Sequence, residues 1–133
     1  MILVDTSVWI EYLRGNDRPE VAALDRLLTD SDVCICGPIL SELLQGVRTD
    51  REVKKILGFT DALVYLPFRD RYFLDAAYLY RTCRKKGVTI RKTIDCFIAA
   101  CAIDRKVALL HADADFAALA QFTPLLLYGQ ENS

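Results

Sequence analysis

The stretch Ile2-Leu3-Val4-Asp5-Thr6-Ser7-Val8-Trp9-Ile10 joins a short apolar run to an acid, a pair of hydroxyl residues and a second apolar group. A short run that is apolar throughout predicts a buried strand, and Thr6 or Ser7 can cap a helix that follows it directly. The stretch therefore predicts a strand that passes into a helix, with Asp5 at the carboxyl end of the strand.

Four further apolar runs alternate with segments of helical periodicity. Most of these runs are apolar at every position, as expected of strands that are covered on both faces. This alternation predicts a three-layer α/β domain with a central, mostly parallel sheet flanked by helices. The expected strands are residues 2–4, 33–36, 63–66, 107–110 and 125–127.

Helix boundaries are marked by a few residues. Pro19 and Pro38 fit the first turn of a helix, and Thr49 with Glu52 forms a capping box. Longer helical patterns cover residues 70–87 and 94–103.

The composition is that of one globular domain. The chain has 133 residues, of which 53% are hydrophobic and 26% charged, and we expect residues 1–133 to form a single domain. Asp and Glu total 18 against 17 for Lys and Arg, so the chain lacks the overall positive charge of a duplex DNA binder.

Cysteine usage and the amino-terminal segment bear on the compartment. The five cysteines form no C-x-x-C pair and none adjoins the single histidine, so a zinc site is not expected. The first residues resemble neither a signal peptide nor a membrane-spanning segment. We expect no membrane association and a location in the reducing cytoplasm, with the cysteines as small core residues.

Acidic residues follow two of the predicted strands. Asp5 comes directly after the first strand, and Asp113 and Asp115 follow the fourth. Glu42 lies about one turn into the helix after the second strand, and Asp95 lies in the first turn after Thr93. Because parallel sheets place ligands beyond the carboxyl ends of their strands, these acids are expected at one edge.

Carboxylates that converge in this way repel one another unless a cation neutralises them. A set of oxygen ligands favours Mg²⁺ or Mn²⁺, and such an ion can activate water toward a phosphodiester. Taken singly, Asp5 also fits a helix cap, Glu42 an exposed helix acid, and Asp95 a favourable charge in a first helical turn. Their joint placement favours a metal site.

Four segments together resemble PIN domains, specifically the VapC-type toxins of bacterial toxin-antitoxin pairs. The similarity extends over nearly the whole chain and depends on the combination, because a V-D-T-S segment alone is weak evidence. The segments are Val4–Ile10, Ser41–Gly46, Ile94–Ala100 and His111–Phe116.

This resemblance implies a Mg²⁺-dependent endoribonuclease in which Mn²⁺ can substitute. Asp5, Glu42, Asp95 and Asp113 match the acidic quartet of the family, with Asp5 and Asp95 as the most direct metal ligands. Thr6 matches a hydroxyl residue that binds acidic side chains or water, and Ser7 can assist it. Asp115 is an additional candidate in a loop where family members differ.

The resemblance also implies partners. The family cleaves structured RNA, often in transfer RNA or ribosomal RNA loops. A VapB-type antitoxin would block the site, and operator DNA would be bound only through that antitoxin. The toxins usually form homodimers.

Three further features bear on substrate and partner. His111 could act as a general base, contact RNA or make a plain hydrogen bond. Basic residues from Arg81 to Lys92 could bind RNA phosphates or simply complete a solvated helix end. A set of apolar residues on two predicted helices could form a groove for an antitoxin helix or simply pack in the core. They are Trp9, Ile10, Leu13, Leu43, Leu44 and Val47.

Two other functions compete with this interpretation. One is a different Mg²⁺-dependent phosphohydrolase with an acid cluster, although a haloacid-dehalogenase-like site would require an acid where Ser7 stands. The other is a PIN-like binding module that has lost catalysis, against which the presence of all four acids argues.

Overall fold

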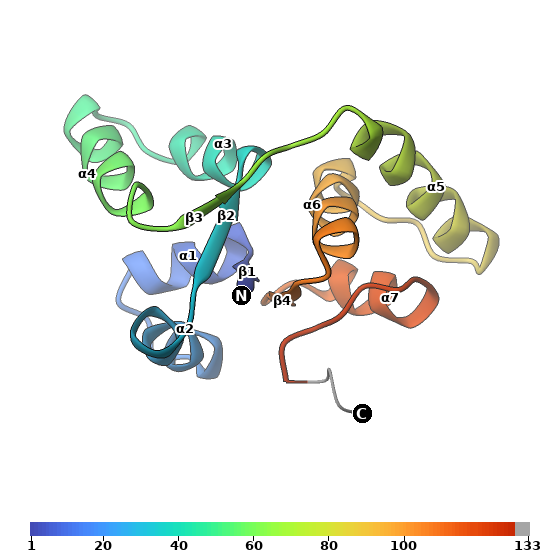
Figure 1. Cartoon of the computed structure of the whole chain (residues 1–133), viewed down its shortest axis with the longest axis horizontal. Coiled ribbons are helices and arrows are strands. Elements are labelled where there is room, and N and C mark those ends of the chain that lie inside the picture. The colour runs from blue at the N-terminus through green and yellow to red at the C-terminus, as the bar shows by residue number, and fades with distance from the viewer. Residues whose placement is uncertain (130–133) are drawn as a thin grey trace.

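The computed structural model describes residues 1–129 and has an α/β architecture (Figure 1). Its strands are β1 (Ile2–Val4), β2 (Val33–Cys36), β3 (Val64–Leu66) and β4 (Ala108–Leu110). They form one sheet in the order β3-β2-β1-β4, and every neighbouring pair is parallel. The predicted α/β class with a parallel central sheet is confirmed.

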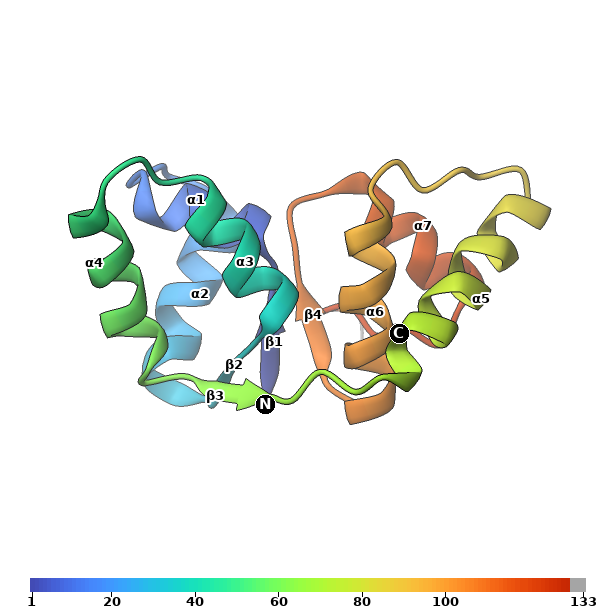
Figure 2. The same ribbon diagram turned by 90° about the horizontal axis from the view of Figure 1, so that it is seen from above.

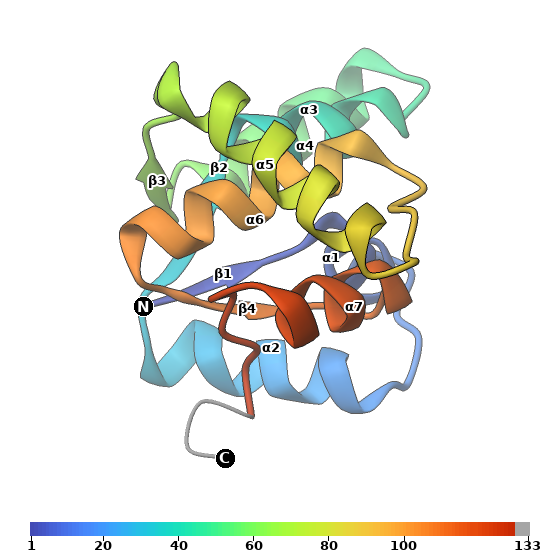
Figure 3. The same ribbon diagram turned by 90° about the vertical axis from the view of Figure 1, so that its right-hand side faces the viewer.

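The helices surround this sheet. Helices α1 to α4 lie on one side of the molecule and α5 to α7 on the other (Figure 2). Viewed from the side, α6 lies above β1 and β4 and α2 lies below them, which gives the three layers (Figure 3). The helices are α1 (Thr6–Leu13), α2 (Pro19–Asp30), α3 (Gly37–Gln45), α4 (Asp50–Thr60), α5 (Arg71–Lys85), α6 (Thr93–Arg105) and α7 (Ala114–Phe122).

The core is built around strands β2 and β4 and helix α6. All four residues of β2 and all three of β4 are buried. Helix α6 is buried over much of its circumference, including Cys96, Ile98 and Ala99. Its small and apolar residues let it pack closely on the sheet, and this contact fixes the amino end of α6 relative to the strand ends.

One predicted strand is wrong. Residues 125–127 form only a single parallel bridge, between Leu127 and Leu109. Leu109 exchanges two backbone hydrogen bonds with this segment, to Leu126 and Tyr128. The chain then turns at Gly129, whose φ is 87°, so pairing ends before a ladder can form.

The start of α1 decides between two alternatives from the sequence. The N-cap is Asp5, which also fitted that role, and not Thr6 or Ser7; its side chain accepts a hydrogen bond from the Ser7 amide. The hydroxyl residues lie inside the first turn instead, where their side chains are free to contact acids. Helix α7, capped by Asp113, was not among the expected helices. Among residues 1–129, no helix is long and apolar enough to cross a membrane.

Candidate metal centre

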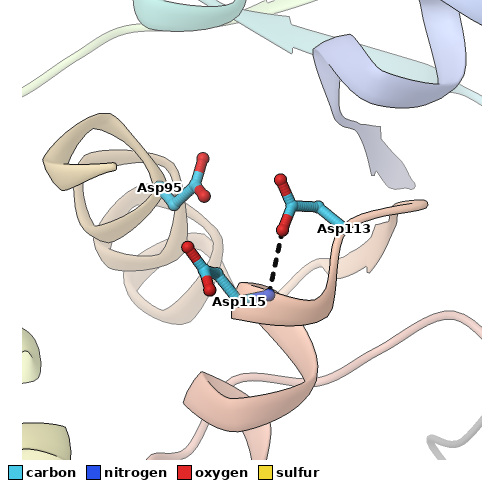
Figure 4. A group of neighbouring side chains, drawn as sticks. All are labelled: Asp95, Asp113 and Asp115. Carbon is cyan, nitrogen blue, oxygen red and sulfur yellow. Dashed lines mark hydrogen bonds between the residues drawn. The ribbon is translucent and has the colours of Figure 1, made fainter. Parts of the chain in front are cut away.

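Three aspartates meet at the carboxyl edge of the sheet. Asp95 comes from the first turn of α6, and Asp113 and Asp115 come from the start of α7. Each offers an oxygen atom, and these atoms all lie within 4.8 Å of one another. Figure 4 shows the three carboxyl groups turned toward one another across the gap between the two helices.

Asp115 is the member of this group about which the sequence was least informative. It is buried, at 8% exposure, and its Oδ2 accepts a hydrogen bond of 3.1 Å from the Arg91 amide. Asp113 is held by its capping bond, in which Oδ1 accepts from the Asp115 amide at 2.9 Å. Local backbone bonds therefore fix the orientation of both acids.

Asp5 lies beside this group at the end of β1. Its amide donates to the Leu110 carbonyl at 2.9 Å, which joins the ends of β1 and β4. Its Oδ2 accepts from the Ser7 amide at 3.0 Å and from Ser7 Oγ at 2.6 Å. Ser7 Oγ in turn accepts from the Ala112 amide at 3.0 Å, so one hydroxyl connects Asp5 to the loop that carries Asp113.

Glu42 reaches the same region from α3. Thr6 Oγ1 donates a hydrogen bond of 2.8 Å to Glu42 Oε1. Neither Asp5 nor Glu42 belongs to the group of three aspartates within 4.8 Å, but the negative charge of each acts on Asp95. The structure thus brings all five predicted acids into one neighbourhood, with Asp5 and Glu42 flanking the other three.

Burial makes two of the acids, Asp95 and Asp5, resist ionisation. Asp95 is 1% exposed, and its pKa is raised from 3.8 to about 7, chiefly by loss of hydration and further by the charges of Asp5, Asp113 and Glu42, against the opposing charge of Lys92. Burial likewise raises the pKa of Asp5, against the hydrogen bonds from Ser7. The free energy needed to ionise both groups would be recovered on binding a cation.

Two basic side chains already contact the cluster. Lys92 Nζ lies 3.2 Å from Asp113 Oδ2, and Arg91 Nε lies 3.5 Å from Asp115 Oδ1. Burial acts to raise the pKa of Asp113, but the Asp115 amide, Lys92 and Arg91 outweigh it and the pKa is lowered. The sequence predicted that Arg91 and Lys92 could lie near the site, but it did not predict their ion pairs with Asp115 and Asp113.

His111 makes a local hydrogen bond. Its Nδ1 accepts from the Asp113 amide at 3.1 Å, which requires this nitrogen to be unprotonated. Burial lowers the pKa of the imidazole. The ring packs against Phe116, with 5.4 Å between the two ring centroids. Of the roles considered for His111, the plain hydrogen bond is the one for which the geometry is present.

The residues fit a divalent cation. Asp5 Oδ1 and Asp95 Oδ2 are buried and receive no hydrogen bond from the described residues. Buried carboxylate oxygens without a donor are costly, and a hard cation with oxygen ligands satisfies them. The fold and site together define an α/β domain with a cluster of carboxylates that could hold a metal ion.

Comparison with known proteins identifies the family. The chain belongs to the PIN domain family, whose model matches residues 2–121. It is 37% identical over 128 residues to ribonuclease VapC11 of Mycobacterium tuberculosis and to a VapC ribonuclease of Mycobacterium bovis. In each comparison the match covers 94% of this chain and 96% of the relative.

A solved structure shows the same fold. VapBC2 from Rickettsia felis, bound to a DNA fragment from its promoter, superimposes with a TM-score of 0.75 at 20% identity, covering 96% of this chain and 97% of the other. The predicted resemblance to PIN domains of the VapC type is therefore confirmed.

Proposed function

We propose that this chain is a Mg²⁺-dependent endoribonuclease and the toxin of a VapBC-type toxin-antitoxin system, acting in the cytoplasm. The observation that carries the proposal is the pair of buried carboxylate oxygens without donors, on Asp5 and Asp95. They lie beside two further aspartates, in a chain whose curated relatives are named VapC ribonucleases.

Asp5 and Asp95 would be the direct ligands of the cation, and Glu42 and Asp113 would complete the site, with Asp115 as a further ligand. A divalent ion held there would supply Lewis acidity, which activates water and offsets negative charge on a phosphodiester. Mg²⁺ is favoured because every donor is an oxygen, and Mn²⁺ can replace it.

The other residues of the site orient these acids. Thr6 holds Glu42 through its hydroxyl, and Ser7 holds Asp5 through its amide and hydroxyl. Hydrogen bonds of this kind restrict each carboxylate to one orientation, which matters because misplacement of catalytic groups is costly. Thr6 and Ser7 are therefore positioning residues.

A VapB-type antitoxin is the proposed partner, and it alone would contact operator DNA. Ile10, Leu13, Leu43 and Val47 line a groove of about 310 Å³, suited to the apolar face of a helix. Trp9 lies outside this groove, against a neighbouring cavity of about 860 Å³ between α1, α2 and α4. We further propose that residues 1–133 act as one PIN domain, that the protein is a homodimer, and that its substrate is a transfer RNA or ribosomal RNA loop.

The deciding experiment compares wild type with Asp5→Asn and Asp95→Asn on total RNA, in Mg²⁺, Mn²⁺ or EDTA. Asp25→Asn, at an exposed position on α2, is the matched control, and circular dichroism checks folding. Discrete fragments from wild type and the control, lost in EDTA and in both site variants, would support the proposal.

Two results would favour the alternatives. Metal binding without cleavage of any RNA would indicate a binding module that has lost catalysis. Hydrolysis of small phosphate esters in place of RNA would indicate a different phosphohydrolase.

A further inference from the structure

Lys92 occupies a position that its own helix disfavours. It is the N-cap of α6, with φ −116° and ψ 113°, and its side chain makes no capping hydrogen bond. N-cap positions favour Ser, Thr, Asp and Asn, and a cation at the amino end of a helix opposes the helix dipole. A residue that breaks a local rule in this way points to a role outside the helix.

The ammonium group of Lys92 faces the carboxylates. Its Nζ lies 3.2 Å from Asp113 Oδ2, and the negative charges of Asp95 and Glu42 also act on it. Arg91 lies 3.8 Å from Asp113 and 3.5 Å from Asp115. These side chains supply positive charge to the same acids that would bind a divalent cation.

Both cations lie on the solvent side of the acids. The side chains of Lys92 and Arg91 are 51% and 73% exposed, whereas that of Asp113 is 15% exposed. The hydrogen bond from the Arg91 amide to Asp115 holds their loop against the start of α7. An RNA chain that approaches the acids would therefore meet these cations first.

A divalent cation and Lys92 compete for one carboxylate. Because like charges repel, a cation bound at Asp95 and Asp113 weakens the pairing of Lys92 with Asp113. The ammonium group then needs another anion, and a phosphate of RNA is the anion that the proposed reaction brings. Ammonium groups bind phosphate oxygens through charge-assisted hydrogen bonds.

We infer that Lys92 exchanges partners, pairing with Asp113 in the metal-free protein and with a backbone phosphate of RNA once a divalent cation occupies the carboxylates. This inference rests on the proposed ribonuclease function and makes Lys92 a substrate-binding residue. An ion pair that only stabilises the fold would support metal binding and RNA binding alike. If Lys92 exchanges partners, removing its charge should instead strengthen metal binding and weaken RNA binding.

The test uses Lys92→Met, which keeps an unbranched side chain one atom shorter than that of lysine and removes its charge. Without the competing ammonium, the Kd for Mn²⁺ measured by titration calorimetry should fall by about threefold or more. On an RNA that wild type cleaves, KM should rise about tenfold, and the salt dependence of RNA binding should lose about one unit of slope.

Two further variants sharpen the test. Lys92→Arg keeps the charge and should restore RNA binding. Lys54→Met removes an exposed lysine on α4, which lies across the molecule from α6 (Figure 1), and should change neither the Mn²⁺ affinity nor the KM.

Two outcomes would overturn the inference: weaker binding of both Mn²⁺ and RNA by Lys92→Met, or no change in either. If wild type cleaves no RNA, the proposed function fails separately, and filter binding of bulk transfer RNA in Mn²⁺ decides the role of Lys92. A loss of binding in Lys92→Met would then support the phosphate contact, and unchanged binding would exclude it.

Discussion

Asp5 serves the fold and the site through different oxygen atoms. Oδ2 caps α1 by accepting from Ser7, while Oδ1 is buried without a donor among the described residues. The capping bonds fix the carboxyl group, so the second oxygen has little freedom to turn toward solvent. A strand that ends in this acid would therefore present the proposed ligand atom in a fixed orientation.

Ser7→Ala should weaken both the fold and the proposed metal centre. The change removes the 2.6 Å hydrogen bond to Asp5 and leaves the Ala112 amide without its partner. We expect a loss of about 1 to 3 kcal/mol in the free energy of unfolding, measured by urea denaturation in EDTA. The Mn²⁺ affinity should fall as well, because Asp5 loses one of the bonds that orient it.

Ser41→Ala is the matched control for this change. Ser41 is exposed on α3, and its hydroxyl accepts only a long, 3.4 Å hydrogen bond from Gln45. Its removal should leave stability and Mn²⁺ affinity close to wild type. Equal behaviour of the two alanine variants would show that the Ser7 bridge contributes nothing measurable.

At the level of elements, the start of α7 combines a helix cap with a proposed metal ligand in one residue, Asp113. Asp113 Oδ1 accepts from the Asp115 amide, while Oδ2 pairs with Lys92. The cap needs only an oxygen acceptor, whereas the proposed metal centre would need the negative charge. Substitutions that keep one property and remove the other can therefore separate folding from metal binding.

Asp113→Asn should keep α7 intact and weaken Mn²⁺ binding, because the amide oxygen still caps the helix. Asp113→Ala should also lose about 1 kcal/mol of stability, because the cap itself is gone. Thermal denaturation followed by circular dichroism, with Mn²⁺ titration, distinguishes the two effects.

Thr49→Ala provides the comparison at another helix. Thr49 caps α4 by accepting from the Glu52 amide at 3.2 Å, and its loss should lower stability by a similar amount without changing the affinity for Mn²⁺. If Asp113→Asn bound Mn²⁺ as wild type does, Asp113 would not be a ligand.

The elements could be predicted where local signals are strong. The continuously apolar runs located β1 and β2 at their observed bounds, and Pro19 marked the start of α2. The run at residues 125–127 has the same composition, yet it pairs at only one position. Whether an apolar run becomes a strand depends on the partners that the tertiary fold offers, which no local pattern contains.

For the whole molecule, the convergence of the acids follows from the strand order. Because β1 lies next to β4, Asp5 and the Asp113 loop end at the same edge, and α6 packs so that Asp95 meets them. The rule for parallel sheets was sufficient to predict that edge. The place of Asp115 in the group and the pairing of Lys92 with Asp113 depend on side-chain packing, so the sequence could not specify them.

The acid cluster should also make the stability of the whole protein depend on pH. The pKa of Asp95 rises from 3.8 to about 7 on folding, so the folded state binds this proton more tightly than the unfolded state. Its contribution is fully present below about pH 4 and is lost as pH rises through 7. In EDTA, the stability of wild type relative to Asp95→Asn should therefore fall by about 2 to 3 kcal/mol between pH 5 and pH 8.

A divalent cation should reverse this trend, because it binds the ionised carboxylate and competes with the proton. Mn²⁺ should raise the Tm of wild type more at pH 8 than at pH 6, and should leave that of Asp95→Asn nearly unchanged. The exposed-site variant Asp25→Asn should follow wild type at both pH values, since its acid lies outside the cluster. A Tm increase in Mn²⁺ that is the same in Asp95→Asn as in wild type would place the stabilising ion elsewhere and remove Asp95 from the metal centre.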